Sequence, residues 1–85
     1  MKTAQQQADE QHVKLLAVAD MPRDPYLQVV LCQKDGGYQP FVTWIFNSEC
    51  GGFHEGVYRC TLKEGMESFL ERCNRWEAVP CEAKP

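Results

Sequence analysis

Alternation of apolar and polar residues predicts three β-strands in the middle of this chain. The clearest run covers residues 26–34, where alternate positions separate two faces. One face carries Leu27, Val29 and Leu31, and the other carries Tyr26, Gln28, Val30 and Cys32. Residues 41–47 and 53–60 form two further runs, and glycine pairs at 36–37 and 51–52 mark the turns before them. Because short connections join antiparallel neighbours, these runs predict an antiparallel meander.

The apolar run at residues 13–19 has two readings. Taken alone it resembles a strand, which we favour, but taken with residues 4–12 it places several side chains near one helical face: Ala8, His12, Leu15, Leu16 and Ala19. The helical reading gives the order α-β-β-β-α, which is that of double-stranded RNA-binding domains. Those domains need basic residues at the start of the last helix, whereas residues 62–67 hold more acids than bases. RNA binding is therefore not favoured.

A helix is predicted to begin after Thr61. Thr61 and Glu64 have the spacing of a capping box, in which each side chain bonds the backbone amide of the other residue. An apolar stripe at three- and four-residue steps follows: Leu62, Met66, Phe69, Leu70 and Cys73. We expect this stripe to pack on one face of the sheet and Pro80 to lie beyond the helix end. The fold class is therefore α+β, an antiparallel three- or four-stranded β-meander with a C-terminal amphipathic helix on one face.

The chain of 85 residues has room for one domain. Residues 1–11 are polar and lack a pattern, so we expect a flexible arm there, a single domain at 12–79 and a C-terminal tail at 80–85. The chain shows no apolar segment of the kind that a signal peptide or a membrane span requires, and we expect a cytoplasmic protein.

Charge and cysteine content narrow the function classes. A net charge of -3 argues against binding to nucleic acid or to an anionic membrane surface. The five cysteines are odd in number and form no Cys-x-x-Cys pair, which argues against a disulfide framework and the usual zinc motifs. We therefore expect reduced cysteines, no cofactor and no bound metal.

The central strands carry more apolar surface than one helix can cover. Large apolar residues occupy both faces of the run at 41–47, whereas a one-helix sheet should have one polar face. Three covers are conceivable: the N-terminal segment folded back as a second helix, a second copy of the chain, or an apolar ligand. We favour a non-enzymatic binding or assembly module that dimerises through the sheet, with a small apolar ligand or a protein partner as other occupants. The expected interface or ligand face comprises Val42, Trp44, Phe46 and Tyr58.

Cys50 and His54 supply the alternative hypothesis, a cysteine- or zinc-dependent enzyme. A thiol needs a nearby base to become a nucleophile, and the amides of Gly51 and Gly52 are suited to stabilising an oxyanion. The spacing matches no established catalytic motif, so this hypothesis ranks second.

The aromatic and glycine placement at residues 24–29, 41–47 and 51–58 resembles that of small uncharacterised bacterial proteins, some carried on mobile gene cassettes such as integron arrays. The likeness covers roughly residues 24–75. It implies a compact α+β domain that often self-associates. It implies no activity, so no functional residues are carried over from it.

Overall fold

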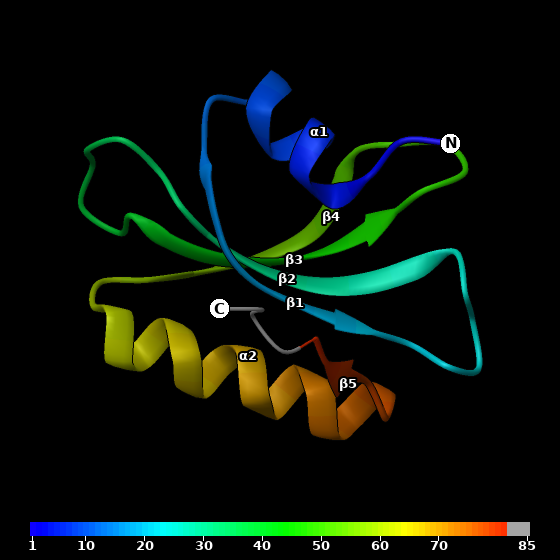
Figure 1. The fold of residues 1–85 in the computed structure, drawn as a ribbon. Helices are drawn as coiled ribbons and strands as arrows, with labels where there is room; N and C mark the ends of the chain where they lie inside the picture. The colour runs from blue at the N-terminus through cyan, green and yellow to red at the C-terminus, as the bar shows by residue number, and fades with distance from the viewer. Residues whose placement is uncertain (82–85) are drawn as a thin grey trace.

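The computed structural model describes residues 1–81 and shows a five-stranded antiparallel sheet between two helices (Figure 1). The elements in chain order are α1 (Ala4–Glu10), β1 (Lys14–Asp20), β2 (Leu27–Gln33), β3 (Phe41–Asn47), β4 (Phe53–Arg59), α2 (Leu62–Trp76) and β5 (Val79–Pro80). The strand order across the sheet is β4-β3-β2-β1-β5. The predicted α+β class is confirmed, with four long strands in a meander and a short fifth strand at one edge.

The two faces of the sheet follow the alternation in the sequence. The cluster beneath α2 contains Ala19, Met21, Val29, Leu31, Ile45, Phe69 and Cys73. The cluster on the α1 side contains Ala4, Val30, Cys32, Val42 and Phe46. The predicted division of alternate side chains between two faces is therefore confirmed for the runs at 26–34 and 41–47, and each face of the sheet has its own core.

Helix α1 overturns the prediction of a flexible arm at residues 1–11. Thr3 caps it, since its Oγ1 accepts from the Gln6 amide at 3.1 Å while its own amide donates to Gln6 Oε1 at 2.8 Å. Ala4 and Ala8 are buried against the sheet. The Oε1 atom of the buried Gln7 accepts a hydrogen bond from the Gly52 amide at 2.8 Å. The segment is ordered by docking, because a helix of seven residues is too short to be stable alone.

Strand β1 confirms the strand reading of the run at 13–19. Residues 14–20 pair antiparallel with β2, with one irregularity between Leu15 and Ala17. The helical reading of residues 4–19 is therefore wrong after Glu10, and the α-β-β-β-α order does not occur.

Helix α2 begins at the predicted capping box, with the Thr61 Oγ1 accepting from the Glu64 amide at 3.1 Å. The predicted stripe is only partly correct. Phe69 and Cys73 are buried, but Leu62, Met66 and Leu70 are exposed. The buried positions of the helix are Gly65, Ser68, Phe69, Arg72 and Cys73.

Helix α2 is thus rotated about its own axis, so that Gly65 and Ser68 face the sheet and Leu62 and Leu70 do not. Close contacts between the helix and the sheet explain this orientation. A Cβ on Gly65 would lie only 3.0 Å from the Cβ of Phe41, so glycine lets the helix approach β3. The hydroxyls of Ser68 and Thr43 share a buried hydrogen bond of 3.2 Å, and the Arg72 guanidinium donates to the Glu55 carbonyl. Polar groups that bond the sheet thus take the place of larger apolar ones.

The C-terminal boundary also differs from the expected tail at 80–85. Val79 and Pro80 pair with β1, and the Cys81 amide donates to the Val18 carbonyl at 2.8 Å. The rest of the predicted tail, residues 82–85, lies outside the described residues.

The two helices are offset on opposite faces of the sheet (Figure 1). Helix α1 packs mainly on β1 and β2, whereas α2 packs mainly on β2, β3 and β4. Part of β3 and β4 therefore lies open on the α1 side, and part of β1 lies open on the α2 side. Neither helix within residues 1–81 is long and apolar enough to cross a membrane.

Candidate functional site: an aromatic platform

Three aromatic rings lie together on the open part of β3 and β4, and we call them the aromatic platform: Trp44, Phe53 and Tyr58. The Trp44 and Phe53 rings stack with centroids 4.7 Å apart and planes 11° apart. The Tyr58 ring meets Trp44 edge-on at 6.3 Å and 86°. Trp44 and Phe53 are half-buried and Tyr58 is 39% exposed, so the platform is a surface feature resting on the core.

Gly56 allows the platform to form. An ideal Cβ at this position would lie 2.7 Å from Nε1 of Trp44 and 3.0 Å from Cε1 of Tyr58. The β3–β4 register shifts between Thr43 and Ile45, opposite this part of β4. Any larger residue at position 56 would therefore displace one of the two rings.

A positive charge borders the platform. The Nζ of Lys34, just after β2, lies 5.3 Å from the centroid of the Tyr58 ring. This distance permits a cation–π interaction, which stabilises the Tyr58 ring in the orientation that places its face towards Lys34. The surface thus combines apolar rings with one ammonium group at its rim.

Of the four interface residues expected from the sequence, two are at the surface. Val42 and Phe46 have no exposed area, because α1 and its core cluster cover them, so they are core residues of this fold. Trp44 and Tyr58 belong to the platform. The sequence reasoning missed Phe53, although β3–β4 pairing places it opposite Phe46 on the same face.

The outer edge of β4 is guarded against pairing with another strand. The Arg59 Nη1 donates to the Tyr58 carbonyl at 2.9 Å, and Arg72 donates to the Glu55 carbonyl. Glu55 itself has a left-handed backbone with φ of 55°. Edge strands are commonly protected by charged side chains and bulges of this kind. The face of β4 is therefore more accessible to a partner than its edge.

Cys50 and His54 lie near each other but bond the same backbone group. The Sγ of Cys50 donates to the Gly51 carbonyl at 3.4 Å, and Nε2 of His54 lies 3.3 Å from the same oxygen. This geometry is not the direct thiol–imidazole contact that a nucleophile and its base require. Within residues 1–81, no group of three or more His, Cys, Asp and Glu side chains is placed to hold a metal ion.

The five cysteines fall into exposed and buried sets. Cys50, Cys60 and Cys81 are exposed, whereas burial raises the pKa of Cys73 and raises that of Cys32 to about 12. Burial also raises the pKa of Cys81, as does its contact with Asp20, whose Oδ2 lies 3.4 Å from the thiol. The buried thiols are therefore poor nucleophiles near neutral pH.

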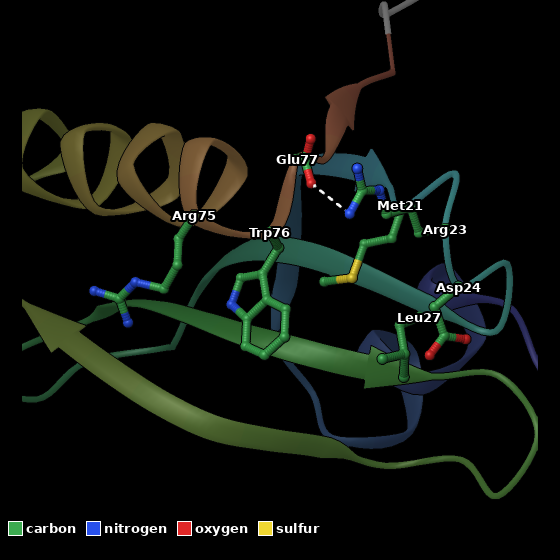
Figure 2. A pocket seen from close by; sticks show the side chains of 7 residues that line it. All are labelled: Met21, Arg23, Asp24, Leu27, Arg75, Trp76 and Glu77. Atoms are coloured by element: carbon green, nitrogen blue, oxygen red, sulfur yellow. Dashed lines mark ion pairs between the residues drawn. The ribbon is translucent and has the colours of Figure 1, made fainter.

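A hollow of about 340 Å³ lies at the C-terminal end of α2 (Figure 2). Met21, Leu27 and the indole of Trp76 supply its apolar lining, and Arg23, Asp24, Arg75 and Glu77 surround it. Figure 2 shows the ion pair between Arg23 Nη1 and Glu77 Oε2, which spans 3.1 Å, while the Arg75 side chain extends away from this pair. The two acids offset the two arginines, so the hollow selects neither an anion nor a cation.

No protein-family model, no curated protein and no solved structure matches this chain. The resemblance to small bacterial proteins of mobile gene cassettes therefore stays a prediction.

Proposed function

We propose that this chain is a small non-enzymatic binding and assembly module that forms a homodimer through the aromatic platform. The observation that carries this proposal is the partly exposed stack of Trp44, Phe53 and Tyr58 on the part of the sheet that α1 leaves open. Aromatic residues are enriched at protein interfaces, where a few of them carry most of the binding energy.

A second copy is the occupant that needs the fewest assumptions. In a two-fold contact the same patch serves both subunits, so one platform on each copy is sufficient. The guarded edge of β4 opposes dimerisation by strand addition, which leaves contact through the sheet face. Helix α1 stands over β1 and β2, and a partner docked on the platform would lie beside it.

Native mass spectrometry and sedimentation velocity of the reduced protein, over a range of concentrations, test this proposal. Tyr58→Glu places a charge within the platform, and we expect the dimer Kd to rise at least tenfold, equivalent to about 1.4 kcal/mol. Tyr38→Glu is the matched control, because Tyr38 is 88% exposed in the loop between β2 and β3. Circular dichroism verifies that both variants fold.

Two results would overturn the dimer. One is a wild-type protein that stays monomeric at every concentration, and the other is an unchanged Kd in Tyr58→Glu. A monomer carrying a small-molecule adduct would favour the platform as a ligand site. A zinc adduct that disappears in Cys50→Ser would favour the cysteine- or zinc-dependent enzyme.

A further inference from the structure

Helix α2 presents a row of exposed apolar side chains that the fold does not use. Leu62, Met66 and Leu70 are 51%, 38% and 51% exposed. Residues four apart are neighbours on a helix surface, so the three side chains form one continuous ridge, which we call the α2 ridge. Single exposed apolar residues are common, but three large ones in line mark an interaction surface.

The α2 ridge borders the part of the sheet that no helix covers on this face. Ser68 and Arg72 are directed to β3 and β4, and Gly65 meets Phe41 and Leu31 of β3 and β2. The opposite flank of the helix, which carries the ridge, therefore faces β1. On β1, Leu16 and Ala17 are only half-buried on this side of the sheet.

We propose that the α2 ridge is a second self-association surface, on which α2 of one copy packs antiparallel against α2 of another. A two-fold axis at Met66 places each Leu62 level with the partner's Leu70, so that the same three side chains serve both copies. Rows of residues four apart pack into one another at helix contacts, and the flexible methionine adapts at the centre.

Charge favours the same arrangement. Lys63 lies beside the ridge, and in the antiparallel pair it falls between the levels of the partner's Glu67 and Glu71. Within residues 1–81, the ion pairs involve neither Lys63 nor Glu67, so both are available for a contact between copies. A parallel pair would instead set each of these residues level with its own like-charged counterpart.

This surface is independent of the aromatic platform, because the two lie on opposite faces of the sheet. A copy that uses both surfaces contacts two others, so the assembly exceeds a dimer and closes as a tetramer or extends further. Leu70→Lys interrupts the ridge, Tyr58→Glu interrupts the platform, and Tyr38→Lys is the control for an added lysine at an exposed position.

Light scattering after size-exclusion chromatography gives the mass of each variant. We expect Leu70→Lys to reduce the wild-type mass to that of a dimer, and Leu70→Lys with Tyr58→Glu to give a monomer. Lys63→Glu should weaken the α2 contact about tenfold, and adding Glu67→Lys should restore it. Because residues 63 and 67 are also neighbours within one helix, urea unfolding of the two variants must show equal stability for the change in mass to report the contact between copies.

The outcomes separate this inference from the platform dimer. A wild-type dimer that Leu70→Lys converts to a monomer would support the α2 contact and refute the platform contact. A mass unchanged by both Leu70→Lys and Lys63→Glu would overturn the α2 contact, whatever Tyr58→Glu does. A wild-type monomer at every concentration would overturn both.

Discussion

Replacing Gly56 by alanine tests whether the aromatic platform depends on the close approach of Trp44 to β4. Gly56 is not among the glycines with positive φ, so its backbone suits alanine and the expected cost is steric. The added Cβ would lie 2.7 Å from Nε1 of Trp44, and the indole must withdraw to at least the 3.4 Å of ordinary van der Waals contact. That shift loosens the stack of Trp44 on Phe53.

Three contributions set the size of the effect. Overpacking costs about 1–3 kcal/mol, and loss of an aromatic pair costs roughly 0.5–1.5 kcal/mol. Alanine also restricts the unfolded chain, which offsets about 0.4–1 kcal/mol. Because the indole is half-buried and has room to move, we expect the lower part of this range, a decrease of about 1.5 kcal/mol in the free energy of unfolding.

Urea unfolding followed by far-ultraviolet circular dichroism measures this decrease. In a Trp44→Leu background the steric conflict is relieved, so the cost of Gly56→Ala should fall by about 1 kcal/mol, which is a coupling typical of residues in contact. Gly36→Ala provides the contrasting case, because nothing lies within 4 Å of the added Cβ and its φ of 82° makes the expected cost one of backbone strain alone, independent of Trp44. Equal costs of Gly56→Ala with and without Trp44 would show that the indole is not the source of the steric conflict.

Three further predictions concern buried polar groups. Burial raises the pKa of Cys32 from 9.0 to about 12, because the folded protein favours the neutral thiol. The contribution of this thiol to the free energy of unfolding is therefore complete below pH 9.0 and declines as the pH rises towards 12, by up to about 1.4 kcal/mol per pH unit. Cys32→Ala should flatten this alkaline decline in urea titrations, and an unchanged slope would contradict the burial argument. Gln7→Ala leaves the Gly52 amide without its acceptor and should destabilise α1 by about 1–3 kcal/mol, visible as faster hydrogen exchange at residues 4–10; unchanged exchange would mean that apolar contacts alone hold the helix. Arg72 has a buried Nη1 with no partner among the described residues, so Arg72→Met, which keeps the aliphatic packing, should cost less in thermal unfolding than Arg72→Ala; equal costs would place the contribution in the guanidinium.

Local sequence patterns were sufficient to predict the elements that depend on near neighbours. Alternation at residues 26–34 and 41–47 specified which side chains share a face, because successive side chains of a strand point to opposite faces. The capping box at Thr61 located the start of α2, since its two hydrogen bonds lie within four residues. A second capping box at Thr3 and Gln6 was also present in the sequence and would have indicated α1.

The docking of the helices on the sheet depends on contacts between segments that are far apart in the chain. The apolar stripe of α2 indicated Leu62 and Leu70 as core residues, but the helix turned so that Gly65 and Ser68 meet the sheet. The spacing of apolar residues does not predict that a glycine lets a helix approach the sheet, nor that two hydroxyls such as those of Ser68 and Thr43 will form a buried hydrogen bond.

The docking of α1 likewise rests on contacts distant in sequence, above all that of Gln7 with Gly52. Val42 and Phe46 are buried in the cluster that Ala4 of α1 joins, whereas Trp44 and Tyr58 stay at the surface beside it. Burial is a property of the whole packed chain, because a side chain is covered by whatever element the fold places above it. The aromatic platform and the α2 ridge, the two surfaces proposed for assembly, therefore follow from where the helices stop covering the sheet.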